Sequence, residues 1–240
     1  MTLATVLIGN NENSKLYVNL KERACREIGI NVKKIELDEN TNNEKITSII
    51  KELNKDCNGI LIQLPLPKNL DKERILNSIA YEKDIDGLTS ISLGKLILGD
   101  EKNAPCTAKA IIHVLENNTI IKGKNITIIG SGNIGKPLSI MLLNRGATMT
   151  VCNEFTKNIK NFTEKSDIII SCAGSPGIIK EDIIKKNSIV IDVGISRIKN
   201  TVKGDIDKNI VKKASLLCPV PGGIGPITIA MLIKRLVNES

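Results

Sequence analysis

Short apolar, β-branched segments alternate with longer amphipathic patterns along almost the whole chain, and this alternation limits the fold more than any other feature. A strict succession of strands and helices is typical of parallel sheets, because each helix returns the chain to the same edge of the sheet. We therefore predict an α/β protein whose sheets carry helices on both faces. The predicted strands are residues 2–8, 33–37, 59–64, 125–130, 148–152, 167–172 and 188–193. The clearest predicted helices are residues 14–28, 43–53 and 107–115.

Composition argues against several classes of function. The 240 residues contain six single cysteines and only one histidine, so the sequence predicts reduced cytosolic thiols and no metal site. Aromatic residues make up 2% of the chain, which argues against the stacking surfaces that bind nucleic acid. The net charge of +8 comes from lysines spread over the whole length. No apolar stretch approaches the ~18 residues of a membrane helix. We therefore expect a cytoplasmic protein with no nucleic-acid or membrane partner.

The most informative stretch is "NITIIGSGNIGKPLSIMLLN", in which a predicted strand is followed by a glycine-rich turn and a predicted helix. The first glycine of a G-x-G-x-x-G turn permits the tight turn, the second lets a pyrophosphate approach the backbone, and the third allows close packing. Unpaired N–H groups at the helix N-terminus would bind the anion. The sequence thus predicts a dinucleotide site, and the alternative is a glycine turn without a ligand. The residues of this turn are Gly130, Ser131, Gly132, Asn133, Ile134 and Gly135.

Glu154 follows the next predicted strand and lies 24 residues after Gly130. An acidic side chain at this position accepts hydrogen bonds from ribose hydroxyls and repels a 2′-phosphate. The sequence therefore favours NAD over NADP as the cofactor. The alternative is that Glu154 is a solvated loop residue.

In the first half of the chain, one predicted helix has a cation in its apolar face. Val18, Lys21, Cys25 and Ile28 follow the i, i+3, i+7, i+10 spacing of a single face, and Tyr17 covers the same edge. The Lys21 amine must therefore either extend outward to solvent or point into a cleft. A partly desolvated lysine amine can transfer protons, so Lys21 is a candidate catalytic group.

Several stretches, in order along the chain, resemble the bifunctional methylenetetrahydrofolate dehydrogenase/methenyltetrahydrofolate cyclohydrolase family. They are "SKLYVNLKERACREIGI", "GILIQLPLPKNLD", "EKDIDGLTSISLGKL", "PCTA", "SCAGSPGII", "VIDVGIS", "GDID" and "CPVPGGIGPITIAML". The resemblance implies two α/β domains around a cleft. Residues 1–107 plus 218–240 would form a folate-binding catalytic domain. Residues 108–217 would form a Rossmann-type domain with a doubly wound parallel sheet.

The resemblance also implies roles for residues of the first domain. Lys21 would be the catalytic group, and Tyr17, four residues before it, would stack on the folate ring system. Gln63 of "IQLPLP" would hydrogen-bond to the lysine and tune it, and Asp86 of "KDIDG" would bind the pterin edge. Plainer interpretations stay open, since Asp86-Gly87 is an ordinary turn signal and Gln63 could be a polar residue at a strand end.

The segment "CPVPGGIGPITIAML" resembles the signature loop that lies by the active-site cleft in this family. The resemblance implies substrate contacts from Pro221, Gly222 and Gly223, and a cofactor contact from Gly223. We expect Gly222, Gly223 and Gly225 to allow close backbone approach to the ligands, while the prolines restrict φ. The resemblance implies further cofactor contacts from Ala173, Gly174 and Ile195.

Some positions depart from the family pattern. Ser131 stands where the family often has an arginine for the 2′-phosphate, and Asn153-Glu154 replaces His-Ser. Both changes favour NAD, although NADP is the family habit. Ala108 and Ala110 replace the proline and glycine at the start of the hinge helix. The family's first helix and strand are missing before "TLATVLIG".

The function implied by the resemblance is NAD- or NADP-dependent oxidation of 5,10-methylenetetrahydrofolate to 5,10-methenyltetrahydrofolate, then hydrolysis to 10-formyltetrahydrofolate. These reactions belong to one-carbon metabolism and purine biosynthesis. The partners would be tetrahydrofolate one-carbon derivatives, and the protein would be a homodimer. Two other functions stay open. One is a shikimate-type NAD(P)-dependent dehydrogenase, which would not need Tyr17, Gln63 and Asp86 to converge. The other is a non-enzymatic dinucleotide-responsive binding protein.

Overall fold

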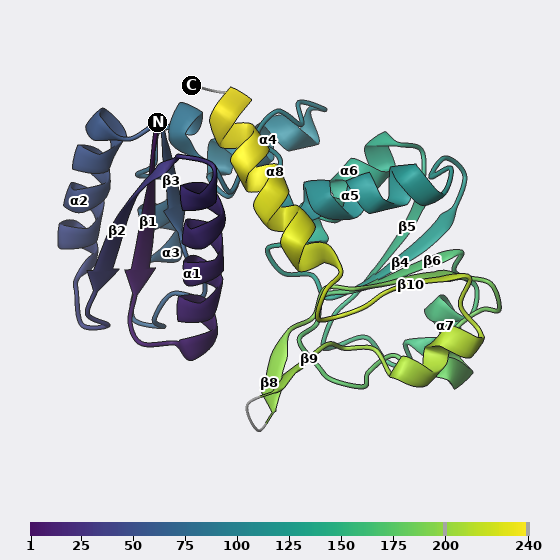
Figure 1. Ribbon diagram of the computed structural model, residues 1–240. Coiled ribbons are helices and arrows are strands. Elements are labelled where there is room, and N and C mark those ends of the chain that lie inside the picture. The colour runs from purple at the N-terminus through teal and green to yellow at the C-terminus, as the bar shows by residue number, and fades with distance from the viewer. Residues whose placement is uncertain (199–200, 239–240) are drawn as a thin grey trace. The chain divides into compact units, whose positions relative to one another are not determined.

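A computed structural model describes residues 1–198 and 201–238 (Figure 1). The chain forms two compact units, Met1–Cys106 with Ile229–Ser240 and Thr107–Thr228. The sequence analysis grouped residues 218–228 with the first unit, whereas the structure groups them with the second. The reason is local, because this segment continues directly from the strand Leu216–Cys218 of the second sheet, and Gly223 lies against Cys218 and Pro219.

The first unit is built on a three-stranded parallel sheet in the order β2-β1-β3. The predicted strand at 2–8 is present with the same bounds, and the other two differ from prediction by two residues at one end. Two short helices after the third strand were not predicted. The strands are β1 (Thr2–Ile8), β2 (Asn31–Leu37) and β3 (Gly59–Ile62). The helices are α1 (Glu12–Glu27), α2 (Asn43–Asp56), α3 (Lys72–Leu76), α4 (Ser90–Ile97) and most of α8 (Ile224–Asn238).

Side-chain caps determine where the two long helices of this unit begin. Asn11 Oδ1 accepts a hydrogen bond from Ser14 N at 3.0 Å, and Asn42 Oδ1 accepts one from Lys45 N at 2.9 Å. Each bond satisfies an N–H group that has no acceptor within the helix, so each asparagine favours a helix start directly after it. The predicted start of α1 at residue 14 was therefore two residues late.

Side chains of the central strand β1 alternate between two cores on opposite faces of the sheet. Val6 packs with Ile46 of α2 on one face. Leu3 packs with Cys25 of α1 and Leu236 of α8 on the other. A fully buried aliphatic side chain stabilises the fold by about 1.5–3 kcal/mol. The sheet is therefore covered on both faces, as a parallel sheet requires.

The second unit contains a five-stranded parallel sheet in the order β10-β7-β6-β4-β5. If the five strands are numbered 1 to 5 along the chain and read from the β5 edge, this is the 2-1-3-4-5 order of a doubly wound sheet. Its switch point lies between β4 and β6. The predicted Rossmann-type sheet is thus confirmed. The strands are β4 (Asn125–Ile129), β5 (Thr148–Cys152), β6 (Ile168–Ser171), β7 (Ile189–Asp192) and β10 (Leu216–Cys218). The helices are α5 (Cys106–Asn118), α6 (Gly135–Asn144) and α7 (Lys160–Thr163).

Within this unit, α5 and α6 lie on one face of the sheet and α7 lies on the other (Figure 1). The inner face of α6 carries Leu138, Met141 and Leu142, which are buried as predicted. Ala108 and Ala110 are buried in α5, which is helical throughout, so these substitutions do not interrupt it. The antiparallel pair β8 (Ser196–Ile198) and β9 (Thr201–Lys203) was not predicted. Three residues are too few for a recognisable alternation.

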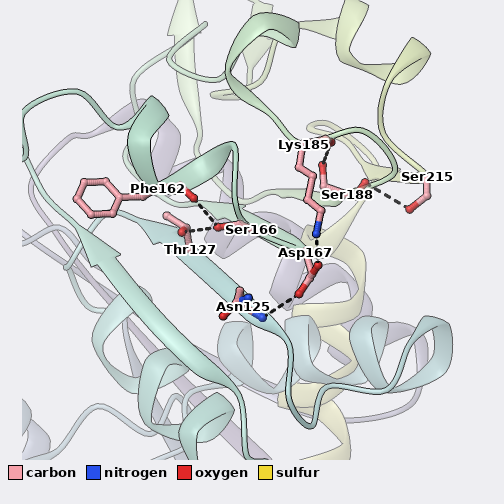
Figure 2. Close-up of polar contacts among 8 residues, drawn as sticks. All are labelled: Asn125, Thr127, Phe162, Ser166, Asp167, Lys185, Ser188 and Ser215. Atoms are coloured by element: carbon pink, nitrogen blue, oxygen red, sulfur yellow. Dashed lines mark hydrogen bonds and ion pairs between the residues drawn. The ribbon is translucent and has the colours of Figure 1, made fainter.

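Polar groups near the amino-terminal edge of the second sheet form hydrogen bonds and an ion pair with one another (Figure 2). Asp167 accepts a hydrogen bond from Asn125 N at 3.0 Å and from Lys185 Nζ at 2.7 Å. The hydroxyls of Thr127 and Ser166 lie 2.6 Å apart and are both buried. The polar groups at this edge therefore form hydrogen bonds with one another.

In the part of the chain that the structure describes, no helix has the length and apolar character needed to cross a bilayer.

Candidate active site

The glycine-rich turn lies at the carboxyl end of β4, next to the carboxyl end of β6. Gly130 has a φ of +110°, and a Cβ there would lie 2.6 Å from Cys172 O. A Cβ on Gly135 would overlap Gly130 O. By contrast, a Cβ on Gly132 would have no atom within 4 Å and would point into open space. The protein itself therefore requires Gly130 and Gly135, whereas Gly132 leaves room beside the backbone for a ligand.

Helix α6 begins without a side-chain cap. Its N-cap residue, Ile134, forms no capping hydrogen bond, and its first turn contains no acidic residue but does contain Lys136. The first N–H groups of a helix have no acceptor within it, and the positive end of the helix dipole favours an anion there. The turn and this helix end are therefore suited to the pyrophosphate of a dinucleotide.

Glu154 lies in an exposed turn just beyond β5, which is the neighbour of β4. Asn153 Oδ1 accepts a hydrogen bond from Phe155 N at 3.0 Å, and Asn153 N donates to Thr156 Oγ1 at 3.0 Å. The two bonds hold the backbone on either side of Glu154. An acidic residue at the end of this strand is in the position from which ribose hydroxyls are bound.

The loop after β6 has its backbone N–H groups turned toward a buried carboxylate. Asp205 Oδ2 accepts hydrogen bonds from Ser171 Oγ at 2.7 Å, Ala173 N at 2.9 Å and Gly174 N at 3.1 Å. Asp205 Oδ1 accepts one from Ser175 N at 2.6 Å. The N–H groups of the predicted cofactor contacts Ala173 and Gly174 are thus bound within the protein. Ile195 is half-buried just before β8.

Asp192, at the end of β7, forms a second buried carboxylate site beside the first. It accepts hydrogen bonds from Asp205 N at 3.0 Å and Ile206 N at 3.1 Å. A Cβ on Gly194 would overlap the Asp205 carboxylate, and one on Gly204 would overlap that of Asp192. Burial, aided by the charge of Asp205, raises the pKa of Asp192 to about 6 against the opposing effect of the backbone N–H groups.

We expect the Asp192→Asn variant to lose part of the pH dependence of folding stability. The folded protein keeps a proton on Asp192 up to a pH of about 6, whereas an unfolded aspartate loses it near a pH of about 4. This group therefore stabilises the fold fully below the unfolded pKa, and the effect is lost as pH rises through the folded pKa. Between about pH 7 and about pH 5, wild type should gain about 1 kcal/mol more unfolding free energy than the variant.

Urea unfolding of both proteins at the two pH values measures this difference. Parallel pH profiles in the wild type and the variant would contradict a raised pKa at Asp192.

In the first unit, Lys21 lies on the buried face of α1 and is only 8% exposed. Its Nζ donates a hydrogen bond to Gln63 Oε1 at 3.2 Å. Gln63, just after β3, donates from Nε2 to Leu64 O at 2.8 Å, and this bond keeps its oxygen turned toward the lysine. Of the two alternatives left open by the helical spacing, extension to solvent is therefore wrong. Ile28 is exposed because α1 ends at Glu27, so it does not belong to the predicted apolar face.

Tyr17 and Asp86 are half-buried in the same unit. Burial raises the pKa of the Tyr17 hydroxyl. The backbone around Asp86 is organised by Asp84, whose carboxylate accepts hydrogen bonds from Gly87 N at 2.9 Å and Thr89 N at 2.9 Å. The Asp86 carboxylate itself has no hydrogen-bond partner in the described ranges.

The loop between β10 and α8 is only partly as expected. Gly222 has a φ of +96°, and a Cβ on Gly222 or Gly225 would meet no atom within 4 Å. A Cβ on Gly223 would overlap Pro219 O and lie 2.7 Å from Cys218 Sγ. The chain's own folding therefore requires Gly223, so close ligand approach is not needed to explain this glycine. Pro221 is exposed and follows a cis peptide bond.

Four charged residues that organise these loops were not singled out from the sequence. These residues are Asp84, Asp192, Asp205 and Arg235, and all four are buried. Arg235 could have been found by the argument used for Lys21, because it is a cation in an otherwise apolar helical segment, and Asp192 because it directly follows an apolar run. Asp84 and Asp205 lie among other charged residues, so the sequence gives no comparable signal for them.

Comparison with known proteins agrees with this arrangement. Residues 1–86 match the family described as tetrahydrofolate dehydrogenase/cyclohydrolase, catalytic domain, and residues 105–240 match its NAD(P)-binding domain. The bifunctional protein FolD of Methanosarcina barkeri is 47% identical over 241 residues, which cover 98% of this chain and 84% of the relative.

Two solved structures are also similar over almost the whole chain. The bifunctional FolD methylenetetrahydrofolate dehydrogenase/cyclohydrolase of Campylobacter jejuni is 41% identical, with a TM-score of 0.94, covering 99% of this chain and 87% of that one. The Trypanosoma brucei FolD, solved with NADP cofactor and inhibitor, is 34% identical with a TM-score of 0.94, covering 99% and 86%. This chain therefore belongs to the tetrahydrofolate dehydrogenase/cyclohydrolase family.

Proposed function

We propose that this chain oxidises 5,10-methylenetetrahydrofolate to 5,10-methenyltetrahydrofolate and hydrolyses that product to 10-formyltetrahydrofolate. Membership of the family supports both activities and leaves the shikimate-type alternative without support. The bound NAD or NADP would supply the hydride acceptor. The turn 130–135 and the start of α6 would hold its pyrophosphate, and residues 1–107 plus 218–240 would bind the folate.

The observation that best supports the hydrolysis step is the part-buried hydrogen bond between Lys21 and Gln63, 3.2 Å long. In the hydrolysis, a water oxygen bonds to the methenyl carbon and the bond from that carbon to N5 breaks. One water proton ends on N5 and the other is released. The Lys21 amine would accept a proton from the water and return one to the leaving nitrogen, with Gln63 holding the amine in place.

The remaining residues of the first unit would position the folate. Tyr17 would stack on its ring system, and the unpaired Asp86 carboxylate would accept hydrogen bonds from the pterin edge. Pro221, Gly222 and Gly223 would contact the substrate from their loop. Positioning of this kind supplies much of the acceleration in a hydride transfer.

A direct assay tests the proposal. Purified protein is mixed with 5,10-methylenetetrahydrofolate and either NAD or NADP, and the absorbance of the reduced cofactor is followed. A separate assay follows the loss of 5,10-methenyltetrahydrofolate without cofactor. Cofactor reduction and methenyl loss are expected. Dinucleotide binding with neither activity would contradict the proposal and favour the non-enzymatic binding protein.

We further propose that NAD is preferred over NADP. A 2′-phosphate would lie beside the Glu154 carboxylate at the end of β5, and Ser131 offers no positive charge to compensate. In a partly desolvated site, the like charges should disfavour NADP by at least about 1–2 kcal/mol, which is roughly tenfold.

We expect the Glu154→Ser variant to narrow this preference, because it removes the negative charge without adding bulk. The measurement is kcat/KM for NAD and for NADP, in the wild type and the variant. Glu164→Ser, at an exposed position beyond α7, is the matched control and should leave the ratio unchanged. A wild-type kcat/KM for NADP that equals or exceeds that for NAD would contradict the preference.

Compartment and assembly are part of the same proposal. The six free cysteines are compatible with a reducing cytoplasm. Strand β2 is at the edge of its sheet, and Leu16 and Leu20 of α1 are 42% and 43% exposed, which supports a homodimer that covers them. The product, 10-formyltetrahydrofolate, would serve purine biosynthesis.

A further inference from the structure

The loop after β6 lies directly against the glycine-rich turn. A Cβ on Gly130 would be 2.6 Å from Cys172 O and 3.1 Å from Ala173 N, so the two backbones are already in close contact. Cys172 Sγ also donates a hydrogen bond to Gly130 O at 3.4 Å. Burial raises the pKa of the Cys172 thiol to about 12, so the thiol keeps the proton that this bond needs. A displacement of the loop would therefore displace the turn.

The shape of this loop depends on a single side chain. Three consecutive N–H groups, those of residues 173, 174 and 175, and the Ser171 hydroxyl all donate to the carboxylate of Asp205. Asp205 is 0% exposed, although residues 173–175 themselves lie at the surface, so their N–H groups point inward to a fully buried acceptor. Consecutive backbone N–H groups are a common way to bind an anion. Here the protein supplies the anion itself.

Asp205 is in turn held in place from two sides. Its own N–H donates to Asp192, and the Gly194 backbone leaves just enough space for its carboxylate. On the outer side of the loop, Ser196 Oγ donates to Gly174 O at 3.0 Å. The carboxylate has no room to move away from the loop. The segment 204–205 that follows β9 therefore determines the conformation of a loop about thirty residues earlier in the chain.

We propose that Asp205 is a positioning residue of the dinucleotide site. It holds the N–H groups of residues 173–175 toward the protein interior. The loop therefore contacts the cofactor through its outer face, and the turn 130–135 binds the phosphates. The carboxylate touches no ligand and acts through the loop. This inference rests on the proposed function only in assuming that the second unit binds NAD or NADP.

The test is Asp205→Asn, which keeps the shape of the side chain but turns an NH2 group toward N–H donors. We expect the dissociation constant for the preferred dinucleotide, measured by calorimetric titration, to rise about tenfold or more. The KM for the dinucleotide should rise with it. Hydrolysis of 5,10-methenyltetrahydrofolate needs no dinucleotide and should stay within about twofold of wild type. Asp207→Asn is the matched control, because Asp207 caps Asn209 N and bonds no part of the loop.

Unchanged dinucleotide affinity in folded Asp205→Asn would overturn the proposal, and so would an equal loss of hydrolysis. If this variant does not fold, Ser171→Ala removes one of the four donors and should weaken dinucleotide binding about threefold. Wild-type affinity in Ser171→Ala would then overturn the proposal. Wild-type protein that binds the dinucleotide but turns over no folate would contradict the proposed function alone, since the affinity test does not depend on turnover.

Discussion

Replacing Lys21 with methionine is expected to reduce hydrolysis of 5,10-methenyltetrahydrofolate by about a hundredfold or more, because the proposed proton carrier is removed. Dinucleotide binding should be unchanged. Stability should change little, since methionine has a similar length and Lys21 already lies between the buried Val18 and Cys25 on α1. The expected result is therefore a folded protein that binds both ligands and does not hydrolyse.

Three measurements on this variant check the expectation: the hydrolysis rate, folate affinity by titration, and the melting temperature. Lys45→Met is the matched control, since it makes the same change at an exposed position of α2 in the same unit. Loss of folate binding with equal loss of both activities would contradict a proton-transfer role. Lys21 would then position the substrate instead.

Replacing Arg235 with alanine is expected to cause a large loss of stability in the first unit. Arg235 is 5% exposed, and its Nη1 donates to Ile85 O at 2.8 Å and to Asp84 O at 3.3 Å. Its Nη2 donates to Ala104 O and to Lys102 O. The variant would leave these carbonyl groups without their donor and open a cavity. We expect a loss of about 3 kcal/mol or more.

Such a loss corresponds to a fall in melting temperature of roughly 6–12 °C for a chain of this size. Arg235→Lys should lie between the variant and the wild type, because an ammonium group cannot reach carbonyls on both sides as a planar guanidinium does. Lys234→Ala, at the exposed neighbouring position of α8, should melt like wild type. A melting temperature for Arg235→Ala within about 1 °C of wild type would show that these bonds contribute little.

The Arg235 contacts also bear on the folate site. Two of the carbonyls that it binds belong to Asp84 and Ile85, directly before Asp86. The Asp84 side chain fixes the residues directly after Asp86. The predicted pterin-binding carboxylate is thus held on both sides by residues that the sequence analysis did not single out.

Much of the fold could be predicted because it follows from neighbours in the chain. The long strands and the helices α1, α2 and α6 have enough residues to show their period, and their ends were wrong by only a few residues. The short elements α3, α4 and β8–β10 were missed, because tertiary contacts rather than local pattern hold them. The glycine-rich turn was predictable for the same reason. A Cβ on Gly130 would collide with Cys172, directly after the adjacent strand β6, and a Cβ on Gly135 would collide with Gly130.

Lys21 and Arg235 illustrate what the sequence alone determined and what only the tertiary structure decided. Each is a cation in an apolar helical stripe and lies on the inner face, which the spacing predicted for Lys21. The sequence does not distinguish their roles, since that depends on partners far away in the chain. Lys21 donates a hydrogen bond to a side-chain amide 42 residues away, at the end of β3, where we propose that its amine transfers protons. Arg235 donates hydrogen bonds to backbone carbonyls up to 151 residues away, and its role is structural. The physical reason is that local spacing in the chain determines which face of a helix a residue lies on. The role of a buried charge depends instead on the groups that tertiary packing places around it.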